Sequence, residues 1–172
     1  KRMESLRIGN SLDKCIDMGA IVAPVQIKTI EELVQQGVDE GCKLWQPSWT
    51  CPKDGYFYPP TLFTGVSPSS TIAQEEIFGP VVTITPFDTE EEALMMANST
   101  AYGLAGTIWT SNLNRAHRVA DELQSGIVWV NAWLVRDLRT PFGGVKASGV
   151  GREGGWEAIR FFTEAKNIFI KY

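Results

Sequence analysis

The clearest hydrophobic pattern in the chain, between residues 105 and 131, predicts a strand, a helix and a second strand. Residues 106–110 and 127–130 are short apolar runs rich in β-branched side chains, as expected of buried strands. Apolar residues recur between them at helical spacing, up to Gly126: Leu113, Ala116, Val119, Ala120 and Leu123. Strand, helix and strand in this space form a crossover, so the two strands should be parallel. The pattern therefore indicates an α/β fold, with a mostly parallel sheet and flanking helices.

A second helix is predicted from Thr29 to about Gly41. Glu31 and Glu32 suit the positive end of its dipole, and the glycine suits its end. Its apolar face is formed by Ile27, Ile30, Leu33, Val34 and Val38. A short strand is expected next, at 42–45.

The remaining elements are shorter. Residues 81–87 form a β-branched run that predicts a strand, and the stretch 47–60, with four prolines, predicts an irregular connection. Thr89 to Glu92 match a capping box, with the threonine placed for the third amide and Glu92 able to reach back. A helix is expected around 156–162. The alternating residues 168–172 predict a terminal strand, which needs a sheet edge that a second copy of the chain could supply.

Residues 141–155 are rich in glycine and include one GxGxxG pattern, at Gly149, Gly151 and Gly154. In a dinucleotide-binding unit this pattern follows a hydrophobic strand directly, so that the pyrophosphate meets a helix N-terminus. The preceding residues, 145–148, are not such a strand. We therefore expect a tightly turning loop and no phosphate cradle.

Composition narrows the class of protein. The 172 residues, 44% of them hydrophobic, suffice for about one domain, and a net charge of -4 argues against a nucleic-acid binder. No apolar run approaches the roughly 18 residues of a membrane span. Three cysteines without a CxxC fit reduced thiols in the cytoplasm. No signal peptide is visible and the chain begins with KRME, so we expect a piece of a longer protein.

No metal site is expected. The acidic run 90–92 has no histidine or second carboxylate cluster beside it, so we interpret it as a solvated helix start. The only histidine, His117, lies between two arginines without a ligand at metal-binding spacing. It is interpreted as a solvent-facing helix residue.

Five motifs in order resemble the NAD(P)-dependent aldehyde dehydrogenase superfamily. They are EEIFGP (75–80), NSTAYGLAG (98–106), SGIVWVN (125–131), PFGG (141–144) and SGVGREGG (148–155). The resemblance implies the C-terminal portion of the catalytic domain over residues 1–163, and a terminal oligomerisation strand over 164–172. It also implies that the cofactor-binding domain is absent from this chain and that the complete protein is a homodimer or homotetramer.

Enzymes of this superfamily bind the aldehyde to a cysteine in a glycine- and glutamine-rich context and pass hydride to the nicotinamide. None of Cys15, Cys42 and Cys51 has that context, and no neighbouring base is evident. The resemblance therefore implies that the catalytic residues precede Lys1 and that the isolated chain is inactive.

The same resemblance gives candidate cofactor residues, for NAD or possibly NADP. Glu76 is similar to the carboxylate that accepts hydrogen bonds from the nicotinamide ribose, which suits vicinal hydroxyls. Phe78 is similar to the aromatic beside the nicotinamide, although plain core packing is the alternative. Gln26 lies where the family has a glutamine near the ribose. Phe142 resembles an aromatic wall of the aldehyde tunnel.

The loop NAWLVRDLRTPFGG (131–144) gives a substrate clue. A guanidinium at Arg136 could hold a substrate carboxylate bidentately. The alternative is an ion pair within the loop, from Arg136 or Arg139 to Asp137. The second half of the chain resembles the 2-aminomuconic and 2-hydroxymuconic semialdehyde dehydrogenases, whose substrates carry a carboxylate. The first half is more similar to family-16 aldehyde dehydrogenases, which include catalytically dead copies.

Two functions from different classes follow. The first is an oxidoreductase that oxidises a carboxylate-bearing semialdehyde to the acid, of which this chain is the C-terminal portion. The second is a catalytically dead assembly or scaffold module of the same fold. The presence of Glu76 and Phe78 favours the enzyme, because a dead copy has no need of a ribose carboxylate.

Overall fold

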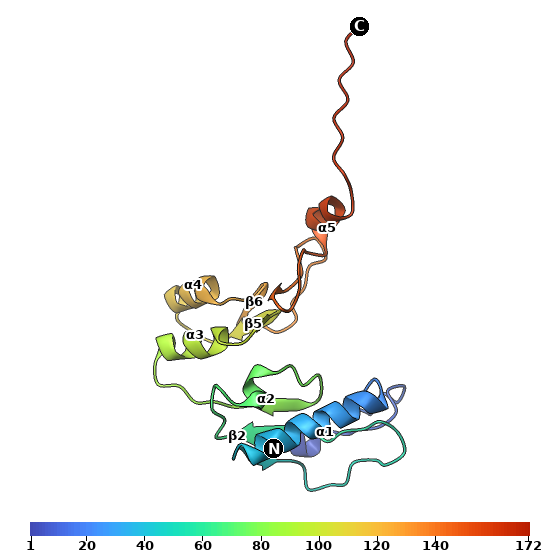
Figure 1. Cartoon of the computed structure of the whole chain (residues 1–172), viewed down its shortest axis with the longest axis vertical. Coiled ribbons are helices and arrows are strands. Elements are labelled where there is room, and N and C mark those ends of the chain that lie inside the picture. Colours follow the sequence, from blue (N-terminus) through green and yellow to red (C-terminus); the bar gives the residue numbers. More distant parts are fainter. The chain divides into compact units, whose positions relative to one another are not determined.

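The structure is a computed structural model that describes all residues, 1–172. The chain divides into two compact units, residues 1–88 and 89–172, each with its own helices and strands (Figure 1). No helix is long and apolar enough to cross a membrane.

The first unit is a three-stranded sheet with one long helix. A 3₁₀ turn, η1 (Met3–Ser5), precedes helix α1 (Pro24–Asp39), and strands β1 (Lys43–Trp45), β2 (Thr61–Thr64) and β3 (Val81–Thr83) pair in the order β1-β2-β3. β1 is antiparallel to β2, whereas β2 and β3 are parallel. The short helix α2 (Thr71–Gln74) lies between β2 and β3 along the chain.

The core of this unit lies between α1, β2 and α2. Ile30 on α1 and Phe63 on β2 are fully buried, with Val34, Ile72 and Ile77 around them. Helix α1 comes close to α2 because position 37 is glycine: a Cβ there would lie 2.8 Å from Ile72. Full burial of side chains such as Ile30 and Phe63 contributes about 1.5–3 kcal/mol each, so this cluster fixes α1 on the sheet.

The second unit contains the predicted crossover. Strand β5 (Ala105–Ile108), helix α4 (Leu113–Glu122) and strand β6 (Ile127–Val130) follow each other, and β5 is parallel to β6 with Gly106 opposite Val128. Helix α3 (Glu90–Asn98) precedes them, and the two-residue strands β4 (Tyr102–Gly103) and β7 (Val145–Lys146) pair antiparallel. Helix α5 (Gly155–Phe161) is the last element.

Two helix starts in this unit are capped as their sequences suggest. The Thr89 side chain accepts a hydrogen bond from the Glu92 amide at 3.1 Å, which confirms the first half of the capping box. Asn112 caps α4 in the same way. Glu90 then joins the two helices, since its carboxylate accepts hydrogen bonds from Arg115 at 2.8 Å and Arg118 at 2.7 Å on α4.

The mixed α/β class is confirmed, with differences in detail. The strands form three small sheets in which two pairings are parallel and two antiparallel. Helix α1 begins at Pro24, five residues before the predicted start, because a proline fits the first turn, where its missing N–H is not needed. Helix α4 ends at Glu122, before the predicted Gly126, and β3 stops at Thr83, well short of residue 87.

The C-terminal residues 163–172 form no helix or strand in the single chain. All of them are exposed, and Figure 1 shows them leaving α5 as an extended segment. A strand at 168–172 needs backbone partners along a sheet edge, and no edge of this chain pairs with it. Strand formation with a second copy stays a prediction.

Close backbone contact at Gly126 generates a stability prediction. A Cβ at this position would lie 1.8 Å from the carbonyl oxygen of Gly143, so Gly126→Ala must push two backbone segments apart. We expect a cost of about 3 kcal/mol, the upper end for overpacking, and a clear fall in Tm. The control is Gly65→Ala, where φ is +66° but nothing lies within 4 Å, so only the backbone strain of about 1 kcal/mol applies. Equal Tm values for the two variants would contradict the packing at Gly126.

Candidate functional site

The motif EEIFGP forms a turn between α2 and β3. Its central residue, Ile77, is buried in the core, while Glu76 and Phe78 on either side are exposed. Phe78 is 70% exposed and has a φ of +54°, a left-handed conformation that is rare for a residue other than glycine. The turn thus presents one carboxylate and one aromatic ring to solvent. Plain core packing, the alternative for Phe78, is excluded within this chain.

Helix α1 lies beneath this turn and contacts it twice. Gln26 in the first turn of the helix donates a hydrogen bond from Nε2 to the carbonyl oxygen of Ile77 at 2.9 Å. Gly79 packs directly on Ile30, because a Cβ at that position would lie 2.5 Å from the Ile30 Cδ1 atom. The three residues expected at the cofactor therefore come together, although Gln26 contacts the backbone of the turn.

The second candidate group lies in the loop after β6. Asn131 at the end of β6 exchanges two hydrogen bonds with the backbone of Thr110, at 2.9 and 2.8 Å, and so joins the ends of β6 and the β5 segment. The Trp129 indole donates to the Val135 carbonyl at 2.8 Å. These contacts hold the start of the loop at the carboxyl ends of two parallel strands, the edge at which α/β sheets commonly bind ligands.

The structure brings the two substrate candidates into contact. The guanidinium carbon of Arg136 lies 4.0 Å from the centre of the Phe142 ring, within the range of a cation–π interaction. No carboxylate lies within ion-pair distance of Arg136. Asp137 instead binds Arg139, whose Nε and Nη2 atoms donate at 2.9 and 2.5 Å. An ion pair within the loop was the alternative to substrate binding, and it forms between Arg139 and Asp137. Arg136 is left without a carboxylate partner.

Two observations support the Arg139–Asp137 pairing. The Arg139 amide also donates to the Asp137 carboxylate, at 2.9 Å, so backbone and side chain converge on one acceptor. Hydrogen bonds from Arg139 lower the pKa of the Asp137 carboxyl below its usual value, and those from Asp137 raise the pKa of Arg139. Both groups are exposed and charged at neutral pH, so the pair selects a loop conformation more than it adds stability.

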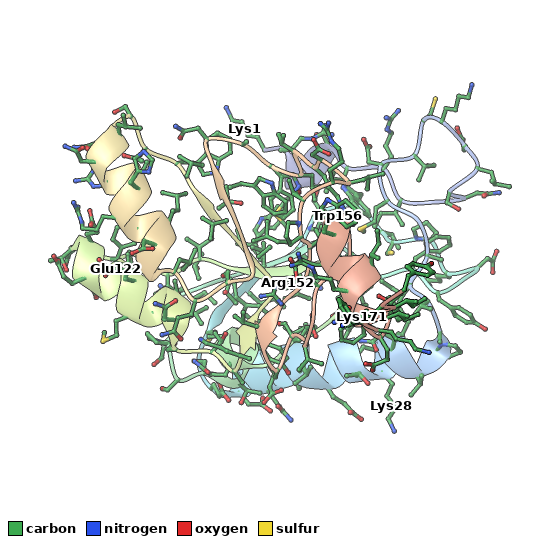
Figure 2. The ribbon with its side chains drawn as sticks, turned by 90° about the horizontal axis from the view of Figure 1, so that it is seen from above. Lys1, Lys28, Glu122, Arg152, Trp156 and Lys171 are labelled. Atoms are coloured by element: carbon green, nitrogen blue, oxygen red, sulfur yellow. The ribbon has the colours of Figure 1, made fainter.

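The glycine-rich segment contacts the backbone of the loop 131–144 and supports it. Phe142 and Glu153 exchange two backbone hydrogen bonds of 2.7 Å, and the Gly155 amide donates to the Leu138 carbonyl at 3.1 Å. Arg152 Nη1 donates to the carbonyl oxygens of Gly144, at 2.9 Å, and Gly151, at 2.6 Å. Figure 2 shows Arg152 among the loops that precede α5.

The GxGxxG pattern forms a tightly turning loop, as expected, and its glycines allow close backbone packing. Gly149, Gly151 and Gly154 have φ values of +151°, +72° and +84°, and a Cβ at Gly154 would lie 2.5 Å from the Thr140 carbonyl oxygen. The strand before the pattern is the two-residue β7, which is antiparallel to β4. No strand-to-helix phosphate cradle is formed. Sequence reasoning missed Arg152 and its partners, although an arginine among glycines was a usable signal for backbone contacts.

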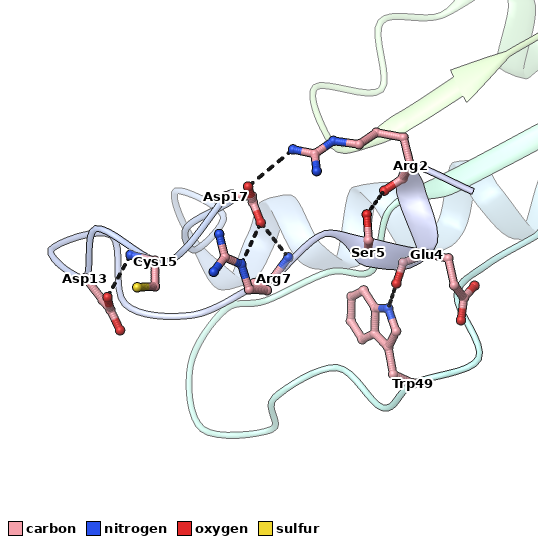
Figure 3. Close-up of polar contacts among 8 residues, drawn as sticks. All are labelled: Arg2, Glu4, Ser5, Arg7, Asp13, Cys15, Asp17 and Trp49. Carbon is pink, nitrogen blue, oxygen red and sulfur yellow. Dashed lines mark hydrogen bonds and ion pairs between the residues drawn. The ribbon is translucent and has the colours of Figure 1, made fainter.

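The three cysteines do not form a nucleophilic site. Cys42 is buried and contacts the Ser70 hydroxyl, and burial raises the pKa of the Cys51 thiol. Cys15 is exposed, in a turn where its amide donates to Asp13 at 2.8 Å. Figure 3 shows that the nearby Arg7 is held by Asp17. All three are free thiols without a base placed to activate them.

The structure contains no group of three or more histidine, cysteine or acidic side chains that could hold a metal. His117 is exposed on α4, as expected.

Comparison with known proteins defines the family. The model of the aldehyde dehydrogenase family matches residues 1–168. The chain belongs to the aldehyde dehydrogenase family. It is 42% identical to the 2-aminomuconic semialdehyde dehydrogenase of Homo sapiens, over 96% of this chain and 36% of the relative. It is 47% identical to a 2-hydroxymuconic semialdehyde dehydrogenase of Pseudomonas sp. strain CF600, over 98% of this chain and 36% of that enzyme.

Solved structures of aldehyde dehydrogenases share the fold. One from Bacillus cereus, an NAD+ complex, has a TM-score of 0.92 and 38% identity over 98% of this chain and 34% of its own. The chain thus spans about a third of the length of these relatives. The muconic semialdehyde dehydrogenases match nearly the whole chain, so the similarity includes both halves.

The role of Arg152 as a brace is testable. We expect Arg152→Gln to free the Gly144 and Gly151 carbonyls and to raise hydrogen–deuterium exchange in peptides covering residues 138–153 by about tenfold, the effect of losing hydrogen bonds to a charged donor. Arg160→Gln is the control, because Arg160 is exposed on α5 and pairs only loosely with Glu157, at 3.6 Å. The same exchange in both variants would show that Arg152 does not brace the loop.

Proposed function

We propose that the complete protein oxidises a carboxylate-bearing semialdehyde to the corresponding acid with NAD(P), and that this chain supplies its C-terminal portion. The observation that carries the proposal is the Arg136 guanidinium, which lies on Phe142 with no carboxylate partner while Arg139 occupies Asp137. An unpaired cation beside an aromatic surface suits a small organic anion. The similarity to two groups of muconic semialdehyde dehydrogenases supports this substrate class.

Arg136 and Phe142 would have different roles in substrate binding. The guanidinium presents two parallel N–H donors that match the two oxygens of a carboxylate, which fixes one end of the substrate. The ring limits the motion of the guanidinium and excludes water from one of its faces, so the charge acts in a less polar environment. The aldehyde at the other end is thereby oriented towards the reaction centre.

The EEIFGP turn would bind the cofactor, which is NAD, with NADP as the other possibility. The exposed Glu76 carboxylate suits the two ribose hydroxyls, and the exposed Phe78 ring suits the face of the nicotinamide. When bound, the cofactor would supply the hydride acceptor for the oxidation. Solved aldehyde dehydrogenases of Bacillus cereus and Mycobacterium tuberculosis that share this fold are NAD+ complexes.

Catalysis would belong to the complete protein. None of the three thiols described above has an activating base, so we propose that the nucleophile lies outside this chain and that the 172 residues alone are inactive. The exposed apolar residues Ile168, Phe169 and Ile170 support assembly through residues 164–172 with a second copy, as a homodimer or homotetramer. The free thiols support a cytoplasmic location.

Substitution of Arg136 tests the substrate class. In the complete enzyme, Arg136→Ala should lower kcat/KM for an acidic semialdehyde by about 10- to 100-fold, mainly through KM, since a hydrogen bond to a charged group contributes about 1.5–3 kcal/mol. Activity with a neutral aldehyde of similar length should change little. Steady-state kinetics with both substrates measure the difference.

The matched control is Arg139→Ala, three residues along the same loop. Arg139 is bound to Asp137, so its loss should change KM for the acidic substrate much less than the loss of Arg136. Equal losses for acidic and neutral aldehydes in Arg136→Ala would refute carboxylate recognition by this residue.

A further inference from the structure

We infer that Gln26 serves the cofactor site indirectly, by holding the Glu76–Phe78 turn in its binding shape. This inference rests on the proposed function for the identity of the ligand. Its structural part rests on one contact, the hydrogen bond from Gln26 Nε2 to the Ile77 carbonyl oxygen at 2.9 Å.

The turn needs to be held because its shape is unfavourable in isolation. Phe78 has a φ of +54°, in the left-handed region where a Cβ crowds the backbone. Its ring is also 70% exposed to water. Neither feature would persist unless the surrounding structure determined it, and strained residues of this kind concentrate at ligand sites.

The Ile77 carbonyl is the group through which this conformation is controlled. It belongs to the peptide unit between Ile77 and Phe78, and the orientation of that unit sets both ψ of Ile77 and φ of Phe78. A donor fixed on this oxygen therefore fixes the direction in which the Phe78 ring leaves the turn. Gln26 provides that donor from a separate element, 51 residues away along the chain.

Helix α1 makes Gln26 a rigid support. Gln26 lies in the first turn of a 16-residue helix whose inner face carries the fully buried Ile30. Ile30 itself contacts Gly79 at the end of the same turn. The helix thus holds the turn at two points: Gln26 binds the carbonyl before Phe78, and Ile30 packs against the glycine after it.

The side chain is suited to this role and less to direct contact. Gln26 is half-buried, and the one hydrogen bond that its side chain makes is donated from the amide nitrogen to the backbone of the turn. Glu76 and Phe78, by contrast, are exposed, and their side chains do not hold the turn in this way. We therefore assign ligand contact to Glu76 and Phe78, and positioning to Gln26.

The test uses the complete protein with Gln26→Met, which keeps the length of the side chain and removes the donor. Two quantities are measured: hydrogen–deuterium exchange of peptides covering residues 72–84 without cofactor, and the Kd for NAD+. We expect exchange in this segment and the Kd both to rise by about tenfold, since a carbonyl loses its partner and the turn loses its fixed shape.

Two further variants separate positioning from contact. Glu76→Gln should weaken NAD+ binding and leave the exchange of the turn unchanged. Gln36→Met, on the same helix but exposed to solvent, should change neither quantity. If Gln26→Met does not fold, Gln26→Glu replaces it, because a carboxylate of the same size removes the donor and repels the Ile77 carbonyl.

The outcomes distinguish this inference from the proposed function. Weaker NAD+ binding with wild-type exchange in the Gln26 variant would mean direct contact with the ligand and would overturn the positioning role, as would no change in either quantity. Faster exchange in a protein whose wild type does not bind NAD+ would support Gln26 as the support of the turn, while the proposed cofactor would be wrong.

Discussion

Packing of α1 against the core through Ile30 is the contact on which the first unit depends. Ile30 is fully buried between the helix and the sheet, and Gly79 passes directly over it. Only glycine allows so close an approach, so the distance between α1 and the EEIFGP turn is set by a hydrophobic contact. Gln26, one helical turn earlier, is then within hydrogen-bonding distance of Ile77. A buried isoleucine thus determines where an exposed carboxylate and ring are presented.

In the second unit, backbone contacts hold the loop that carries Arg136 in place. Its loop 131–144 is largely exposed. Asn131 fixes one end of the loop to the strands. The glycine segment 149–155 fixes the other end, through the backbone pairing with Phe142, the hydrogen bonds of Arg152 and the close backbone approach of its glycines. Such bracing lets a loop hold a charged group in one orientation, which binding a small anion requires.

Much of this architecture could be predicted from the sequence, because the signals were local. The β5–α4–β6 crossover follows from two β-branched runs around an amphipathic helix, and the glycine turn follows from the lack of a hydrophobic strand directly before Gly149. The start of α1 at Pro24 was missed because Val25, in its first turn, is exposed and does not belong to the apolar face that begins later. Helical spacing identifies only the buried face of a helix.

The sequence alone could not show whether Arg136 or Arg139 pairs with Asp137. Both arginines lie within two residues of the carboxylate, and only the turn of the backbone decides which one faces it. Likewise, the Gln26 and Ile77 partnership joins residues 51 positions apart, for which no local pattern exists. The family motifs gave the candidate residues, and the contacts in the fold are the basis on which we propose their separate roles.

We propose that this chain places Arg136 to bind a substrate carboxylate. A crystal structure of the complete protein with NAD+ and a dicarboxylic acid product tests it most directly. We expect two Arg136 nitrogens about 2.7–3.0 Å from one carboxylate of the product, with Phe142 still against the guanidinium. A product carboxylate bound elsewhere, with Arg136 turned to solvent or paired with Asp137, would contradict it.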